Sequence, residues 1–198
     1  MSRVFKNVLC VAALLFAQSG AFGMEKTIDP AHEIGENVTI TDRSQLLSIT
    51  PEQAKKIKSL RIENQVIDGY FISDFFPWSL FLKNIDSLYF FNCVFDRSGT
   101  GILAGVDSVA KIGFVDSGLS ASDVRYIFPP LASWFPIKVI DLSGNRIGED
   151  SRHFVTFLRH DIWETIHVDN LILSGNGISE CDQCEILKAC VEIKNVTF

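Results

Sequence analysis

One eight-residue pattern recurs five times in this 198-residue chain, and it limits the possible folds more than any other feature. Its clearest copies contain LSGNRI at 142–147 and LSGNGI at 173–178. Alignment to these gives five frames: LRIENQVI (60–67), LYFFNCVF (88–95), IGFVDSGL (112–119), IDLSGNRI (140–147) and LILSGNGI (171–178). The frames start 28, 24, 28 and 31 residues apart. Repeats this short bury their apolar residues only against neighbouring copies, so the copies must stack.

Within the frame, positions 1, 3 and 8 are apolar in every copy. Alternation at positions 1 and 3 predicts a short strand with one face turned inward. Position 6 holds side chains that can bond to the turn backbone where the chain leaves the strand. These predicted structural ladder residues are Gln65, Cys93, Ser117, Asn145 and Asn176.

The frame resembles the leucine-rich repeat, LxLxx(N/C)xL, and its repeat lengths resemble the ribonuclease-inhibitor-like class. The resemblance implies an α/β solenoid, with a short parallel β-sheet on the concave face and helices on the convex face. Residues 60–178 are then the repeats, and 179–198 are a C-terminal cap. Residues 24–59 are an N-terminal cap with a degenerate first repeat from Val38, and a closing strand is expected at 191–193. Helices are expected over 148–166, over 179–189 and from Pro51, and the helix of 121–136 must break at Pro129.

The N-terminus has the layout of a secretory signal peptide over residues 1–23. Arg3 and Lys6 precede an apolar run from Val8 to Ala17, which is too short to span a bilayer. Small residues at Ala21 and Gly23 favour cleavage before Met24, although an uncleaved anchor is an alternative. The interpretation predicts a secreted, periplasmic or extracellular protein that has no membrane attachment once processed.

Charge and motifs exclude several classes of function. The net charge is −6, and it becomes −8 once Arg3 and Lys6 leave with the signal, which argues against nucleic-acid binding. No catalytic or nucleotide-binding motif occurs. His153, His160 and His167 are seven residues apart, about 10.5 Å on a helix, too far to share a metal. We therefore expect no metal, no cofactor and no enzymatic activity. Cys93 lies in a ladder position, where a high thiol pKa is expected.

Three cysteines gather in the expected C-terminal cap: Cys181, Cys184 and Cys190. In an exported chain, a disulfide between Cys190 and Cys181 or Cys184 is the favoured interpretation. Zinc binding would need a fourth ligand that the segment lacks, and a redox role would need a different surrounding fold. Three reduced cysteines remain an alternative.

The exposed side of the predicted strands is the candidate binding surface. The resemblance implies that frame positions 2, 4, 5 and 7 face outward. Aromatic and apolar residues thereby meet there within a charged rim, as in protein-binding hot spots. These candidate partner-binding residues are Arg61, Glu63, Tyr89, Phe91, Val115, Asp116 and Asp141.

The function expected from this arrangement is an exported, non-catalytic protein-binding module with a partner of unknown identity. Small exported repeat proteins of this kind resemble microbial effectors that act on host proteins. The alternatives are a structural or envelope protein that self-assembles through its repeat ends, and a secreted enzyme. The sequence does not decide the oligomeric state.

Overall fold

The computed structural model describes residues 36–79, 85–96, 102–103, 109–128, 137–159 and 168–198. The chain divides into two units, Met1–His32 and Glu33–Phe198, and every described residue belongs to the second. The expected signal peptide at 1–23 and the first part of the expected N-terminal cap lie outside the described residues. Among the helices that are described, none combines the length and the apolar character needed to cross a membrane.

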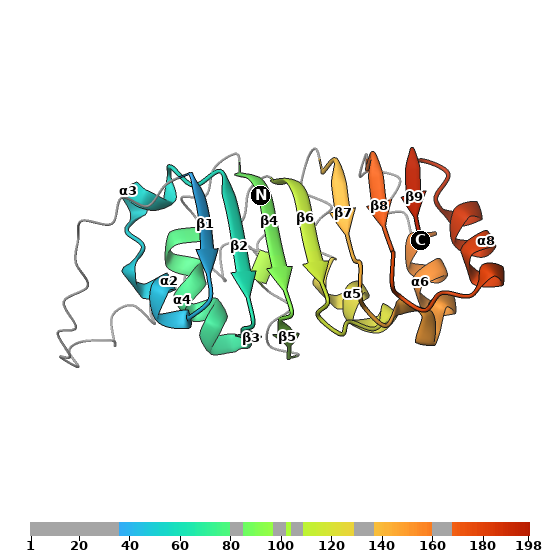
Figure 1. The fold of residues 1–198 in the computed structure, drawn as a ribbon, viewed down its shortest axis with the longest axis horizontal. Coiled ribbons are helices and arrows are strands. Elements are labelled where there is room, and N and C mark those ends of the chain that lie inside the picture. Colours follow the sequence, from blue (N-terminus) through green and yellow to red (C-terminus); the bar gives the residue numbers. More distant parts are fainter. Residues whose placement is uncertain (1–35, 80–84, 97–101, 104–108, 129–136, 160–167) are drawn as a thin grey trace, which may run out of the picture. The chain divides into compact units, whose positions relative to one another are not determined.

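The fold is α/β, with one seven-stranded sheet whose strands are all parallel. Each strand pairs with the next one of this sheet along the chain (Figure 1). The strands are β1 (Asn37–Ile40), β2 (Ser59–Glu63), β4 (Ile85–Phe91), β6 (Val109–Val115), β7 (Val139–Asp141), β8 (Asn170–Ile172) and β9 (Asn195–Thr197). A separate two-stranded pair is formed by β3 (Val66–Ile67) and β5 (Val94–Phe95).

Short helices connect the strands. They are α2 (Arg43–Ser48), α3 (Pro51–Ala54), α4 (Gly69–Ser79), α5 (Ala121–Ile127), α6 (Ser151–Leu158) and α8 (Glu180–Ala189). In Figure 1 the helices α4, α5 and α6 lie behind the strands, on one face of the sheet. We call the opposite face, on which none of the described helices lies, the front face.

The five frames stack in register. Position 1 of each frame is paired with position 1 of the next, through Leu60, Leu88, Ile112, Ile140 and Leu171. All five of these side chains are buried, and so are all five at position 3. At the N-terminal end β1 adds Val38 opposite Leu60, in the segment where a degenerate first copy is expected.

The closing strand is not where it was expected. Strand β9 occupies 195–197 rather than 191–193, and Val196 is the residue paired with Leu171. The physical reason is a turn at Val191 and Glu192, closed by a hydrogen bond from the Ile193 N–H to the Cys190 carbonyl (3.1 Å), which brings the chain back to the sheet before the strand begins. Lys194 forms an ion pair with Asp169 (2.6 Å) at the start of the strand.

The helix boundaries follow local signals. Thr50 and Ser120 cap α3 and α5 through reciprocal capping boxes, with Gln53 and Asp123 as the respective partners. Helix α5 ends at Ile127, before the Pro129-Pro130 pair, as expected. The helix expected from residue 148 begins instead at 151, after a 3-10 turn at Ile147–Asp150, and is described to Leu158.

A series of phenylalanine ring contacts runs through the core between the sheet and the helices. Phe90 and Phe114 on neighbouring strands stack with ring centroids 5.1 Å apart. Phe114 then meets Phe128 at 5.6 Å, and Phe128 meets Phe157 at 6.4 Å, both nearly edge-on. Such ring pairs add about 0.5–1.5 kcal/mol each beyond their area burial, so the aromatic side chains tie the strands to the helices behind them.

Candidate functional site

The front face carries frame positions 2 and 4, because strand alternation turns positions 1 and 3 into the core. From β2 to β8, position 2 is Arg61, Tyr89, Gly113, Asp141 and Ile172, and position 4 is Glu63, Phe91, Val115, Ser143 and Ser174. Arg61 and Asp116 are exposed, whereas Glu63, Tyr89, Phe91 and Asp141 are partly buried. Six of the seven candidate partner-binding residues thus retain accessible surface.

Val115 is the exception among the expected binding residues. Its side chain is only 9% exposed. It lies in register with Phe91 on the neighbouring strand. Val115 therefore offers little surface as an anchor of its own.

Tyr89 and Phe91 form a stacked pair on β4. Their ring centroids are 5.6 Å apart and their planes differ by 19°. The guanidinium carbon of Arg61 lies 3.4 Å from the centroid of the Phe91 ring, and the same side chain pairs with Glu63. A cation over an aromatic face with a carboxylate beside it is an attractive arrangement, and it fixes Arg61 against the front face.

Tyr89 extends across the neighbouring strand over Gly113. A Cβ atom at Gly113 would collide with the Tyr89 ring, so only glycine leaves room for this contact. Burial and the nearby Asp141 carboxylate both raise the pKa of the Tyr89 phenol. We call the set Arg61, Glu63, Tyr89, Phe91, Gly113 and Asp141 the aromatic patch. A glycine inside a strand is a sequence signal for such a close approach, so Gly113 could have indicated this contact.

The turn that follows each strand has the same backbone conformation in all five frames. Position 5 has a positive φ throughout: Asn64 (56°), Asn92 (50°), Asp116 (51°), Gly144 (69°) and Gly175 (73°). Glycine, asparagine and aspartate are the residues that adopt this left-handed region most readily. Asn92 also donates a side-chain hydrogen bond to Asn64 (2.7 Å). The shared requirement explains why position 5 is asparagine, aspartate or glycine in every frame.

Asn145 makes the densest contacts of the predicted ladder. Its Nδ2 donates to the carbonyl groups of Phe114 (2.5 Å) and Leu142 (2.8 Å), and its Oδ1 accepts from the N–H groups of Ser117 (3.2 Å) and Leu119 (3.0 Å). Asn145 is 4% exposed. One buried amide therefore satisfies backbone groups of two successive turns.

Asn176 has the same role one frame later. It donates to Leu142 and Leu173 (both 2.8 Å) and accepts from the N–H of Ile147 (3.3 Å). The earlier position-6 residues make fewer or weaker contacts. The Cys93 thiol donates to the Ile62 carbonyl at 3.5 Å, and the Ser117 hydroxyl donates to its own neighbour Val115 at 3.0 Å.

Gln65 is the longest side chain in this row. Its Nε2 reaches the Thr41 carbonyl (2.7 Å) and the Glu63 carbonyl (3.0 Å). The ladder thus begins at the turn that follows β1. The ladder is weakest at Cys93 and Ser117 and densest at Asn145 and Asn176.

The structure does not form the expected disulfide at the C-terminal end. All four described cysteines are free: Cys93, Cys181, Cys184 and Cys190. Cys181 and Cys184 lie on α8, and Cys190 is its C-cap. Cys184 and Cys181 lie six and nine residues before Cys190, which corresponds to a rise of about 9 and 13.5 Å along a helix. A disulfide needs Cα atoms about 4.4–6.8 Å apart. The continuous helix therefore holds Cys190 too far from either partner.

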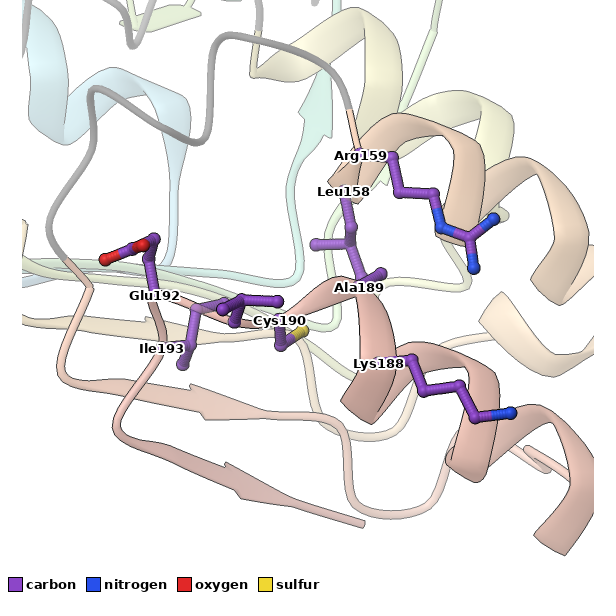
Figure 2. A pocket seen from close by; sticks show the side chains of 8 residues that line it. Leu158, Arg159, Lys188, Ala189, Cys190, Glu192 and Ile193 are labelled. Carbon is purple, nitrogen blue, oxygen red and sulfur yellow. The ribbon is translucent and has the colours of Figure 1, made fainter.

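A pocket of about 470 Å³ lies beside the end of α8. Figure 2 shows its lining, in which the charged ends of Arg159 and Lys188 point away from the Cys190 thiol. Burial raises the pKa of Cys190 to about 11 and also raises that of Cys93, so both thiols are protonated at neutral pH. A neutral thiol without a converging charged group is a packing element and not an activated nucleophile.

In the described ranges, no three His, Cys, Asp or Glu side chains are arranged to hold a metal ion. No protein-family model matches the chain, and no curated protein sequence matches it. The function must therefore be inferred from the geometry of the front face.

Proposed function

We propose that this protein is an exported leucine-rich-repeat protein that binds a partner protein through the front face of its sheet. The observation that carries the proposal is the stacked pair of Tyr89 and Phe91. The pair lies on the front face of the sheet, with charged residues around it. Clustered aromatic side chains within a polar rim are typical of interface hot spots.

The family part of the proposal is supported by the regular stacking of the five frames. Position 1 is paired in register from Leu60 to Leu171, position 5 has a positive φ in each frame, and Asn145 and Asn176 bridge successive turns. The export part is supported by the signal-like segment at residues 1–23. N-terminal sequencing of exported protein is expected to begin near Met24, and a product that keeps residues 5–15 would contradict export by cleavage.

The binding part is tested by capture experiments with the full chain and a Tyr89→Ala/Phe91→Ala double variant. We expect a captured partner to be lost from the double variant, with binding weakened by at least about 2 kcal/mol. The matched control is Tyr126→Ala, because Tyr126 is 65% exposed on α5, away from the front face. Loss with Tyr126→Ala and retention with the double variant would place the binding surface elsewhere.

Self-assembly through the ends of the sheet is the second candidate function. It is favoured by β9, a three-residue terminal strand paired only with β8 in the described part of the chain, and by the 80% exposure of Val191. Size-exclusion chromatography separates the two functions. A concentration-dependent oligomer that Val191→Glu dissociates supports assembly, whereas a monomer at all concentrations supports partner binding alone.

A further inference from the structure

The front face already contains one bound guanidinium group, that of Arg61. This group lies over the Phe91 ring at 3.4 Å from its centroid and pairs with the Glu63 carboxylate. The planar guanidinium suits both contacts, because it stacks on an aromatic face and donates in its own plane to a carboxylate. The Phe91 ring and the Glu63 carboxylate thus form a cation site, and Arg61 supplies the cation.

The same combination recurs on the next part of the face without a cation. Tyr89 lies beside Phe91, and its ring covers Gly113, which is paired with Asp141 on the next strand. The Asp141 carboxylate also helps to raise the pKa of the Tyr89 phenol. The Oδ1 of Asp141 accepts from the N–H (3.0 Å) and the hydroxyl (2.7 Å) of Ser143. These bonds hold the carboxylate in place and leave its Oδ2 without a hydrogen bond from the described residues.

Asp116 is an exposed carboxylate in the turn that follows β6. Its side chain lies over Gly144, where any Cβ atom would collide with it. No ion pair joins Asp116 or Asp141 to a cation within the described ranges. Lys111, two residues before Gly113 on β6, is the nearest basic residue along the strand and is also exposed.

We propose that Tyr89 and Asp141 form a binding site for an arginine side chain of the partner protein. This inference rests on the proposed partner-binding function and specifies the chemistry that the front face recognises. The guanidinium stacks on Tyr89 and donates to Asp141, as Arg61 does with Phe91 and Glu63. The net charge of −8 after signal removal also favours approach of a basic segment.

The test uses the full chain and a fluorescent hexa-arginine peptide, with binding measured by anisotropy at 0.15 M salt. At this ionic strength, charges more than about 8 Å apart are largely screened. We expect Asp141→Asn to weaken binding about fivefold, and Tyr89→Leu to do the same. The asparagine keeps an oxygen for Ser143, and the leucine still covers Gly113, so both variants are expected to fold.

Two controls isolate the site from general electrostatic attraction. Glu52→Gln removes one exposed negative charge from α3, away from the front face, and is expected to change binding less than twofold. A hexa-citrulline peptide has nearly the same shape without the charge and is expected not to bind. Hexa-arginine is tested up to 1 mM, a concentration chosen to detect interactions of about 4 kcal/mol. The inference would be overturned if hexa-arginine does not bind at this concentration, if hexa-citrulline binds equally well, or if Glu52→Gln weakens binding as much as the site variants do.

Capture of the natural partner separates this inference from the function on which it rests. If capture is lost with Tyr89→Ala/Phe91→Ala but kept with Asp141→Asn, the front face binds the partner without an arginine in this site. If both variants capture normally, the front face is not the binding surface, and both proposals fail.

Discussion

The middle and the C-terminal part of the sheet are held together in different ways. Strands β4 and β6 are seven residues long and join six paired positions, with Phe90 stacked on Phe114 behind them. Strands β7 and β8 are three residues long. The short strands depend instead on Asn145 and Asn176, which bridge one turn to the next.

The front face differs between the same two regions. The middle strands carry Tyr89 and Phe91, whereas the turns after β7 and β8 carry serine and glycine at frame positions 4 and 5. Long strands and a phenylalanine core make a firm base for the aromatic pair. The comparison shows that the ladder side chains stabilise the fold where the paired strands are short. The aromatic patch lies where the paired strands are long.

The largest effect is expected from a substitution that removes a ladder asparagine in the C-terminal part of the sheet. Asn145→Leu leaves buried carbonyl and N–H groups of two turns without partners, and we expect a loss of about 3 kcal/mol in the free energy of unfolding. Cys93→Ala, in the same frame position of the middle part, is expected to cost about 1 kcal/mol, because its thiol bonds are weak. Urea unfolding of both variants measures the difference, and equal costs would remove the distinction between the regions.

Alkaline pH tests the packing at the end of α8. Burial raises the pKa of Cys190 to about 11, so the fold favours the neutral thiol. Its contribution is fully present below the unfolded thiol pKa of about 9 and is lost as pH rises through 11, by about 2 kcal/mol. We expect Cys190→Ala to show a smaller loss of unfolding free energy between pH 9 and 11 than the unmodified chain. Parallel pH profiles for the two proteins would contradict this role.

A double-mutant cycle tests the contact under the aromatic patch. Gly113→Ala places a methyl group against the Tyr89 ring and is expected to destabilise the chain by about 1 kcal/mol. In the Tyr89→Leu background the penalty is expected to fall, because the more flexible leucine side chain can move aside. Additive effects in thermal unfolding would show that the ring does not depend on the glycine.

The smallest effect is expected from placing a ladder asparagine in the middle part of the sheet. Cys93→Asn gives position 6 the amide that Asn145 and Asn176 use, within reach of the Ile62 carbonyl that the thiol already contacts. We expect a gain of about 0.5–1 kcal/mol in the free energy of unfolding. The reverse change, Asn176→Cys, serves as the matched control and is expected to destabilise. A destabilised Cys93→Asn variant would mean that the phenylalanine core leaves no room for the amide.

Much of this architecture could be predicted because the frame encodes it in each copy separately. Apolar positions 1 and 3 indicate strands with one buried face, and Leu60 to Leu171 are buried and paired in that register. The α/β class and the parallel sheet follow from such repetition. The leucine-rich-repeat assignment itself stays a proposal.

The remaining features depend on contacts between frames that no single copy contains. Arg61 reaches Phe91 on another strand, and Tyr89 covers Gly113 on a third, so neither contact is visible in the spacing. The disulfide prediction was wrong because clustering in sequence ignored the rise of α8 between Cys184 and Cys190. Val115 was placed on the correct face, but its burial there could not be predicted from the frame.

The most direct test of the central claim is hydroxyl-radical footprinting of the unmodified chain, with and without its captured partner. Side-chain oxidation is read for four aromatic residues, of which Tyr89 and Phe91 belong to the patch, while Tyr70 and Tyr126 are exposed elsewhere. We predict that the partner protects Tyr89 and Phe91 and leaves Tyr70 and Tyr126 unchanged. Protection of Tyr70 or Tyr126, with Tyr89 and Phe91 oxidised as before, would contradict binding through the front face.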